Sequence, residues 1–379
     1  MQRLAIILAS LFSFLLTLSA ASAADPTPIA LGYVGLVDIA PTATGYAAVY
    51  VDFANGDILF RRLDATGRPG PEVVLGPLFE YPYPFELAIV PEGKGFVVYA
   101  SGRARTIRAL PIDANGQPRG TVKELARYDT DWDVVDAGGS HLLVYNTFRT
   151  GFHVFSQVVR LDGSPAGDPN PLAVSPDIGF ITSGFMDDVG VALTDRGFLA
   201  AWSVYTLRTV NSRPLRSNGR GDGPGPETVA AGDCSRGAVT YGGTGDGAVI
   251  YATCASPQLA LRLHGPSEYA DPIPLDIDGR TVFTGFFEID LAADGPRDEV
   301  GVLVATMPPE SDPDDPIWVF GRYDAGGKRL SPLLDLSAAY GVFGSGVHVR
   351  WDARRSTYVL SWTGTGPQGD GVYTLRVPR

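Results

Sequence analysis

The sequence is poor in cysteine, histidine and basic residues, and each shortage narrows what the protein can do. It has 2 Cys and 4 His among 379 residues, too few and too scattered for a metal-ligand cluster. Lys and Arg number 30 against 42 Asp and Glu, so the formal net charge is −12. Because phosphate-binding surfaces rely on clustered Lys and Arg, we expect neither nucleic acid nor anionic membranes as partners. Phosphate-binding loops and nucleophile elbows are also missing, and nothing points to a metal or cofactor.

Long apolar runs are missing too, except at the start of the chain. Leu4–Leu18 is apolar apart from three hydroxyl residues, follows Arg3, and precedes the small residues Ala21–Ala23. This order predicts a signal peptide over residues 1–24, since the run is too short and wrongly flanked for a stable membrane span. We therefore expect a secreted or periplasmic monomer without membrane insertion. Its mature chain, residues 25–379, is predicted to form one domain.

The two cysteines are Cys234 and Cys254. In an oxidising compartment, two cysteines twenty positions apart most simply form one disulfide. The alternative is a metal-binding pair, but it lacks further ligands because the four histidines lie far away in the sequence.

The abundant feature is a repeat. An apolar run that ends in an aromatic residue recurs, and a second apolar run follows at nearly constant spacing. The aromatic residues are Tyr50, Tyr99, Tyr145, Trp202, Tyr251 and Trp362, with Ala305 in the equivalent place of a further unit. A short β-like stretch such as "LVDIA" precedes each aromatic run, and most units end in a fourth stretch such as "PEVVL", "DPIPL" or "SPLLDL". Four antiparallel strands in units of about fifty residues predict an all-β, seven-bladed β-propeller.

The seventh unit has only three strands, because the sequence stops directly after "VYTLRV". The stretch "PIALGYV", Pro28–Val34, precedes the first unit and belongs to no hairpin of its own. We expect it to be the outer strand of the last blade, which closes the ring and removes open sheet edges.

A second repeated phrase joins the third and outer strands, as in "RRLDATGRPG". It places Asp64, Asp113, Asp162 and Asp324 directly before a glycine turn. Asp in this position can bond its own backbone and tolerates tight turn geometry. We interpret these aspartates as turn residues, because other units carry Arg216, His264 and Arg376 at the same place.

The whole pattern is a glycine, an apolar run ending in Tyr or Trp, a variable loop, and an apolar-Asp-x-x-Gly hairpin. It resembles the seven-bladed β-propeller repeats of exported bacterial proteins along the full mature chain, and the resemblance implies the fold alone. No functionally defined family is matched. WD40 repeats would show Gly-His and Trp-Asp pairs, and kelch repeats a double glycine in every blade. Here "GG" falls in inconsistent places.

Propellers bind ligands where the loops between blades converge at the mouth of the central channel, and these loops are rich in aromatic residues. Exposed rings suit sugar faces or peptide side chains, but rings also fill apolar gaps between blades. The aromatic candidates for ligand contact are Tyr81, Tyr83, Tyr128 and Trp132.

Polar candidates near the same mouth are Asp131, Asp133, Asp188, Glu288, His348 and Arg350. Paired carboxylates can act as acid and base in glycoside cleavage, and His348 with Arg350 would suit a lyase or phosphoesterase. Because His348 and Arg350 alternate along one inner strand, an ion pair with a neighbouring blade is the other interpretation.

Three functions remain open from the sequence. The one it favours is a non-catalytic exported propeller that binds a glycan, a peptide or a partner protein through the aromatic loops. The second is an extracellular polysaccharide-acting enzyme, a glycoside hydrolase or lyase, that uses the carboxylates at the channel mouth. The third is a structural interaction module of the cell surface.

Overall fold

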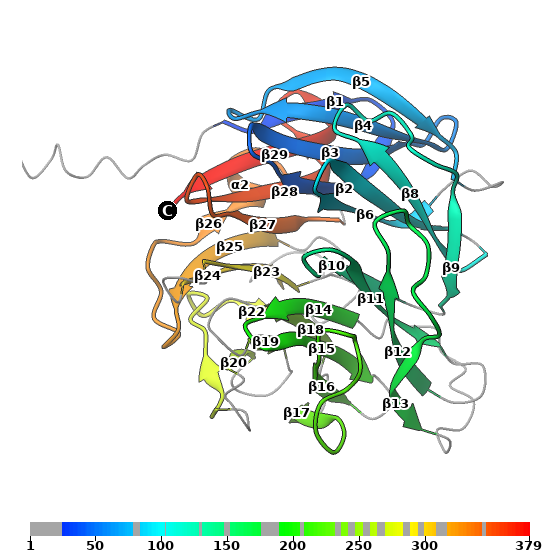
Figure 1. Ribbon diagram of the computed structural model, residues 1–379. Coiled ribbons are helices and arrows are strands. Elements are labelled where there is room, and N and C mark those ends of the chain that lie inside the picture. The colour runs from blue at the N-terminus through cyan, green and yellow to red at the C-terminus, as the bar shows by residue number, and fades with distance from the viewer. Residues whose placement is uncertain are drawn as a thin grey trace, which may run out of the picture.

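The computed structural model describes residues 25–78, 84–102, 104–128, 131–147, 152–175, 189–204, 208–231, 236–241, 247–252, 258–263, 270–282, 289–294, 299–307, 317–342 and 346–379. The chain is a seven-bladed β-propeller of antiparallel sheets, which confirms the predicted fold class. The colour in Figure 1 runs once around the ring, so that the red C-terminal strands lie beside the blue N-terminal ones.

We number the blades in chain order and give their strands from the inner to the outer edge. Blade 1 is β2 (Val34–Pro41), β3 (Gly45–Asp52), β4 (Asp57–Asp64) and β5 (Pro69–Gly76). Blade 2 is β6 (Pro84–Glu92), β7 (Gly95–Gly102), β8 (Thr106–Asp113) and β9 (Lys123–Arg127). Blade 3 is β10 (Trp132–Asp136), β11 (His141–Thr147), β12 (Phe152–Val159) and β13 (Asn170–Ser175). Blade 4 is β14 (Val189–Thr194), β15 (Gly197–Val204), β16 (Thr209–Leu215) and β17 (Glu227–Ala231).

The remaining blades depart more from regularity. Blade 5 is β18 (Arg236–Tyr241), β19 (Ala248–Ala252), β20 (Leu259–Leu263) and β21 (Ile273–Pro274). In blade 6, β22 (Thr281–Val282) and β23 (Ile289–Asp294) both pair with β24 (Glu299–Met307), which is followed by β25 (Ile317–Asp324) and β26 (Leu334–Asp335). Blade 7 is β27 (His348–Asp352), β28 (Thr357–Gly366), β29 (Gly369–Pro378) and β1 (Thr27–Leu31).

The outer strands of blades 5 and 6 are two residues each, shorter than their sequences predicted. Pro272, Pro274 and Pro332 lie in or beside these strands and cannot donate to a β-ladder. After β26 the chain forms the short helix α2 (Leu336–Tyr340) instead, where the Asp335 side chain accepts from the backbone N–H of Ala338. No helix in the described part of the chain is long and apolar enough to cross a membrane.

The hydrophobic core lies between neighbouring blades. Tyr99 of blade 2 packs in one cluster with Trp132 and Tyr145 of blade 3. Trp202 of blade 4 packs with Leu142 of blade 3 in the next. The repeated aromatic residue of each unit is therefore buried because it fills the space between two twisted sheets, as dense interior packing requires.

The strand β1 is the outer strand of blade 7. It pairs antiparallel with β29, with Ala30 opposite Val372, so the stretch after the predicted signal peptide and the end of the chain share one sheet. Ile29 is 1% exposed and packs in a cluster with Val372 of β29 and Tyr50 of blade 1. This cluster joins the last blade to the first.

The repeated Asp-Gly phrase forms the hairpin between the third and outer strands of blades 1, 2 and 6, as predicted. In blade 3 the prediction is wrong by two residues, because Arg160 occupies the equivalent turn position and Asp162 follows it within the turn. In blade 2, Asp113 Oδ1 accepts from the backbone N–H groups of Asn115 and Gln117, both at 2.8 Å. The hairpin glycine, Gly116, has a φ of 84° and lies against Phe60 of blade 1. The phrase is repeated because each hairpin both closes its own blade and packs on the preceding one.

Candidate functional site

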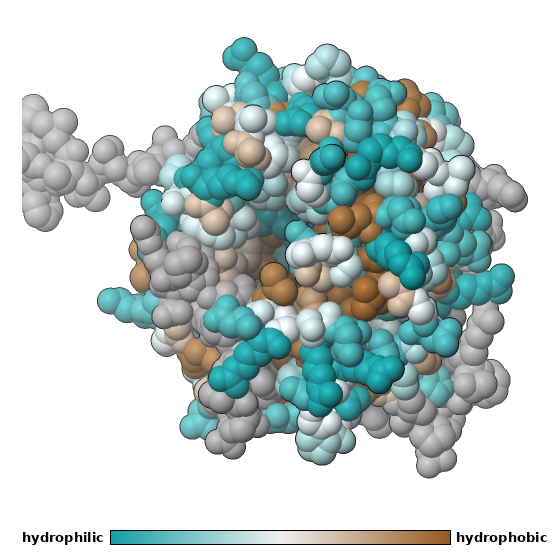
Figure 2. Space-filling model, viewed as in Figure 1, coloured by the Kyte–Doolittle hydropathy of each residue, from teal (hydrophilic) through white to brown (hydrophobic). Residues whose placement is uncertain are grey.

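The inner strands follow one another around a closed circle. β2, β6, β10, β14, β18 and β23 each contact the next one, and β27 contacts both β23 and β2. The side chains of these strands are therefore the ones nearest the middle of the ring, where propellers hold ligands. Figure 2 shows one face of the ring, which is hollowed near the middle. Hydrophobic side chains lie beside the hollow, and hydrophilic ones lie toward the outer rim.

Aspartates join the inner strands of neighbouring blades. On β2, Asp38 accepts from its neighbour Ile39 through Oδ1 and from Ile89 of β6 through Oδ2, both at 2.9 Å. The carboxylate is 5% exposed. A buried carboxylate that accepts two backbone N–H groups loses little of the hydrogen bonding it had in water.

The same arrangement recurs around the ring. Asp133 accepts from Val134 at 2.7 Å and, across the blade boundary, from Val191 at 2.8 Å. Asp131 accepts from the backbone N–H groups of Trp132 and Val189, at 2.8 and 2.6 Å. Asp290 accepts from those of Leu291 and Val349, at 2.8 and 2.9 Å. We call Asp38, Asp131, Asp133 and Asp290 the bridging aspartates. Each one links two blades through backbone N–H groups of both.

Arg350 connects three blades at once. From β27 its Nη2 donates to Asp38 of blade 1 at 3.0 Å, and its Nη1 lies 3.4 Å from Asp290 of blade 6. His348, two residues earlier, places Nδ1 3.5 Å from the same Asp290 carboxylate. The ion pair with a neighbouring blade, one of the two interpretations of these residues, is therefore present.

The bridging aspartates have unequal electrostatic surroundings. Burial raises the pKa of Asp133 to about 6, although the two backbone N–H groups and Arg350 oppose that rise. Burial acts on Asp290 as well, but the hydrogen bond from His348 and the charge of Arg350 outweigh it, so the pKa of Asp290 is lowered. Burial would lower the pKa of Arg350, yet Asp38 and Asp290 raise it well above the ordinary value, so Arg350 stays charged.

Glycosidases use two carboxyl groups in their active site, one that stays protonated because its pKa is raised and one that is ionised. Here, however, both oxygens of Asp133 accept backbone N–H groups, and so do both oxygens of Asp290. A general acid must present a proton to its substrate, whereas these groups are occupied in holding strands together. The geometry therefore assigns the bridging aspartates to the architecture of the ring.

The two described aromatic candidates lie in the core. Tyr128 and Trp132 are 3% and 5% exposed and belong to the cluster between blades 2 and 3. Tyr128 donates its hydroxyl to Ser101 Oγ at 2.8 Å. These rings fill the gap between blades, which is the alternative role considered from the sequence, and neither presents a face to solvent.

The other sequence candidates lie outside the described residues. They are Tyr81, Tyr83, Asp188 and Glu288, together with the cysteines Cys234 and Cys254. Their roles in ligand binding and in a disulfide stay predictions. Within the described residues, no group of three or more His, Cys, Asp and Glu side chains is placed to hold a metal ion.

The sequence analysis did not single out Asp38 or Asp290 and gave Asp133 only a candidate acid or base role, although a signal for contacts between blades was present. Each lies inside an otherwise apolar strand, in "LVDIA", "EIDLA" and "WDVV". A carboxylate in the middle of an apolar strand is rarely buried unless it is paired. Three such residues on inner strands could have predicted contacts between blades.

Comparisons with known proteins support the fold and no particular family. No family model and no curated protein matches the sequence. Among solved structures, BBS1N in complex with ARL6DN gives a TM-score of 0.55 at 12% identity, over 94% of this chain and 96% of that one. The Cps50 (Swd1) β-propeller domain of Myceliophteria thermophila gives 0.50 at 12% identity, over 92% and 98%. Raptor of Chaetomium thermophilum gives 0.53 at 11% identity, over 95% of this chain and 29% of that one. Identities this low show a shared propeller fold only.

Proposed function

We propose that this protein is an exported, non-catalytic binding protein that holds a glycan, a peptide or a partner protein at the loops around the middle of the propeller. The observation that carries the proposal is that the buried acidic side chains of the inner strands have a structural role. The bridging aspartates spend both carboxylate oxygens on backbone N–H groups of two blades, so they build a rigid ring. Rigid scaffolds that display loops are a common basis for recognition.

Two further observations agree with binding. The hollowed face in Figure 2 has hydrophobic side chains beside the hollow, and such concave apolar surfaces are where ligands and partners bind. The similar propeller BBS1N was solved in complex with ARL6DN, so a propeller of this shape can hold a partner protein. A signal peptide over residues 1–24, as the sequence predicts, would direct the protein to bind outside the cytoplasm.

The test is a binding screen with the purified mature chain, residues 25–379. It would be applied to a glycan array and, separately, used to capture proteins from the culture medium and cell envelope of the source organism. We expect one class of ligand to bind saturably, and binding to survive in Asp133→Asn, which keeps one of the two acceptor oxygens for a backbone N–H. Release of new reducing ends from extracellular polysaccharides, abolished by the same variant, would overturn the proposal.

A polysaccharide-acting enzyme is the second candidate, because of one specific observation. The pKa of Asp133 is raised to about 6 while the pKa of Asp290 is lowered, and both residues belong to inner strands of the ring. An enzyme of this kind would show a bell-shaped rate profile with its upper limb near pH 6. The binding protein has no such profile.

A further inference from the structure

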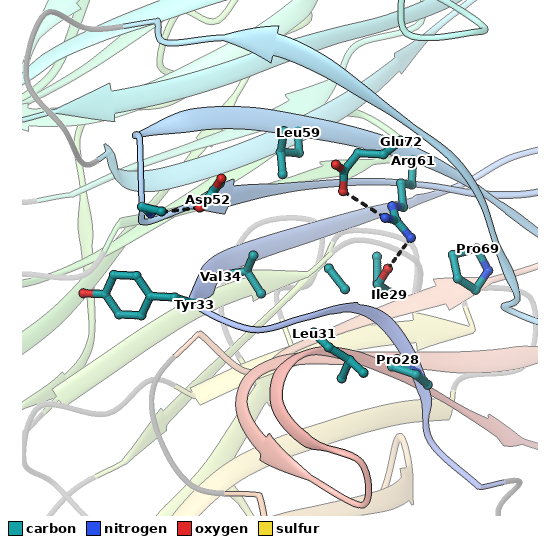
Figure 3. Close-up of a pocket in the computed structure, with 12 residues that line it drawn as sticks. Pro28, Ile29, Leu31, Tyr33, Val34, Asp52, Leu59, Arg61, Pro69 and Glu72 are labelled. Atoms are coloured by element: carbon teal, nitrogen blue, oxygen red, sulfur yellow. Dashed lines mark hydrogen bonds and ion pairs between the residues drawn. The ribbon is translucent and has the colours of Figure 1, made fainter.

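A groove of about 610 Å³ runs along the seam where blade 7 meets blade 1. One wall is β1 with the segment that leads to β2, and the other wall is formed by β4 and β5 (Figure 3). None of the bridging aspartates lines this groove. It is therefore separate from the surface of the proposed function, and either proposal can fail alone.

The sides of this groove carry exposed apolar side chains. Leu31 is 51% exposed and Tyr33 is 70% exposed, and both line the groove. Val74 is 59% exposed and lies two residues after the groove residue Glu72 on β5, so it projects from the same face of that strand. These three are half of the six large apolar side chains exposed in the described part of the chain. Such a concentration at one seam marks an interaction surface.

The wall formed by β1 is an edge strand. β1 is the terminal strand of its sheet and pairs only with β29. Arg61 of β4 donates to the carbonyl oxygen of Ile29 at 2.9 Å and pairs with Glu72 at 2.9 Å, which fixes β1 against blade 1 (Figure 3). The Ile29 carbonyl is therefore occupied and Pro28 has no N–H, so an extended peptide that adds to this edge would pair with the remaining backbone groups of β1.

The charge at the groove is acidic. Arg61 is engaged by Glu72 and by the Ile29 carbonyl, so its charge is already balanced. Asp52 lines the groove and stands opposite Asp57 in the β3–β4 hairpin, which places two carboxylates at one end. The formal charge of the chain, −12, has the same sign. A segment that fits this groove would carry Lys or Arg at that end, because opposite charges steer association and fix register.

We propose that this groove binds an extended segment of a partner protein, in which apolar residues alternate and at least one residue is basic, by adding it to the free edge of β1. Alternate side chains of such a segment would pack on Leu31 and Tyr33 from one strand and on Val74 from the other. The basic residue would lie near Asp52.

The experiment selects short peptides from a random display library on the immobilised mature protein and measures their affinity by calorimetry. We expect the selected sequences to alternate apolar residues and to contain Lys or Arg. Leu31→Ser and Tyr33→Ser should each weaken binding by about tenfold or more. Leu193→Ser is the matched control, because Leu193 is 48% exposed on blade 4 and should leave binding unchanged.

Two results would overturn this proposal. One is a selection that yields no enriched peptide, or peptides that bind the Leu31→Ser and Leu193→Ser variants equally well. The other is self-association of the wild-type chain in sedimentation that Leu31→Ser abolishes, since the groove would then be an interface between two copies. Asp52→Asn supplies a check on charge. It should lessen the salt dependence of peptide binding.

Discussion

Arg350 of β27 donates to Asp38 of β2 at 3.0 Å, across 312 positions of sequence. The same guanidinium reaches Asp290 of blade 6. Arg350, a residue of blade 7, therefore supplies positive charge to carboxylates of blades 1 and 6. The chain itself passes between blade 7 and blade 1 from the outer strand β1 to the inner strand β2, and the contact of Arg350 with Asp38 adds a side-chain link between the inner strands of the same two blades.

Removing Arg350 should weaken that junction. Arg350→Met leaves Asp38, which is 5% exposed, and Asp290, which is 13% exposed, without their cation. We expect a loss of about 2 kcal/mol in the free energy of unfolding, less than for a fully buried pair because the arginine is 38% exposed. Urea titration followed by tryptophan fluorescence measures it.

Arg216→Met is the matched control for this change. Arg216 pairs with Asp222 at 3.0 Å, but the two side chains are 64% and 56% exposed. Exposed pairs contribute less than about 1 kcal/mol. Equal losses in the two variants would contradict the role assigned to Arg350.

The stability of the protein should rise on mild acidification. Burial raises the pKa of Asp133 from an ordinary 3.8 to about 6, so between these values the folded state binds a proton that the unfolded state does not. Folding is then favoured as the pH falls from 7 toward 4, by up to about 3 kcal/mol from this group. The lowered pKa of Asp290 acts in the other direction, and its contribution is lost only in stronger acid.

Melting temperatures recorded from pH 7 to pH 3 test this expectation. The wild type should be most stable near pH 5 and lose stability below about pH 4. Asp133→Asn cannot titrate at this position and should show a smaller rise between pH 7 and 5. A wild-type melting temperature that falls steadily over this range would refute the assignment.

The hairpin glycines offer a paired test of blade packing. Gly116 and Gly67 occupy equivalent turns with φ of 84° and 87°. A Cβ on Gly116 would lie 2.4 Å from the ring of Phe60, whereas the nearest atom to one on Gly67 is at 3.5 Å. Gly67→Ala should cost about 1 kcal/mol, for the backbone alone. Gly116→Ala should cost about 3 kcal/mol because overpacking is added.

Thermal or urea unfolding of both variants gives the difference directly. A Gly116→Ala loss no larger than the Gly67→Ala loss would show that the hairpin tip is not packed against blade 1.

The two cysteines are predicted to form a disulfide. Cys234 and Cys254 lie outside the described residues, so the prediction rests on their number and on the oxidising compartment that the predicted signal peptide implies. Peptide mapping without reduction should recover one linked pair, and Cys254→Ser should cost about 3 kcal/mol.

The double variant is the control for the disulfide. Cys234→Ser with Cys254→Ser should be no less stable than either single variant, since one bond is lost in all three. Two thiols that alkylate freely in protein recovered from an oxidising compartment would contradict the prediction.

Export can be tested on its own. The predicted signal peptide over residues 1–24 implies that the mature protein begins at Asp25, two residues before β1. Edman sequencing of the protein recovered from the medium or periplasm should start there. A protein that keeps residues 1–24 and stays in the cytoplasm would contradict the proposal that it is exported.

The architecture was predictable from sequence because each blade is a local unit. The aromatic residue of each repeat, the β-strand stretches and the Asp-Gly hairpins depend on residues within about fifty positions of one another. The exceptions were the outer strands of blades 5 and 6, where prolines beside Ile273 and Leu334 shorten the ladder. Their effect depends on which N–H groups face a partner, and a repeat pattern does not give that.

The site was much less predictable. Asp38 and Ile89 are 51 positions apart, and Asp290 and Val349 are 59 apart. Whether such residues meet depends on how one sheet is staggered against the next, and a strand pattern carries no information about that stagger. For the same reason, Tyr128 and Trp132 were candidates for ligand contact when in the structure they close the gap between blades 2 and 3.

The pairing of β1 with β29 sets an order of events during synthesis. Thr27 lies opposite Thr374, so β1 is synthesised long before the strand with which it pairs. Until then its edge is open, and assembly of the final sheet is a slow, long-range step that leaves time for wrong associations. A nonsense mutation early in β29 would therefore disturb blade 7 and also the placement of β1, since in the described part of the chain β1 pairs with β29 alone.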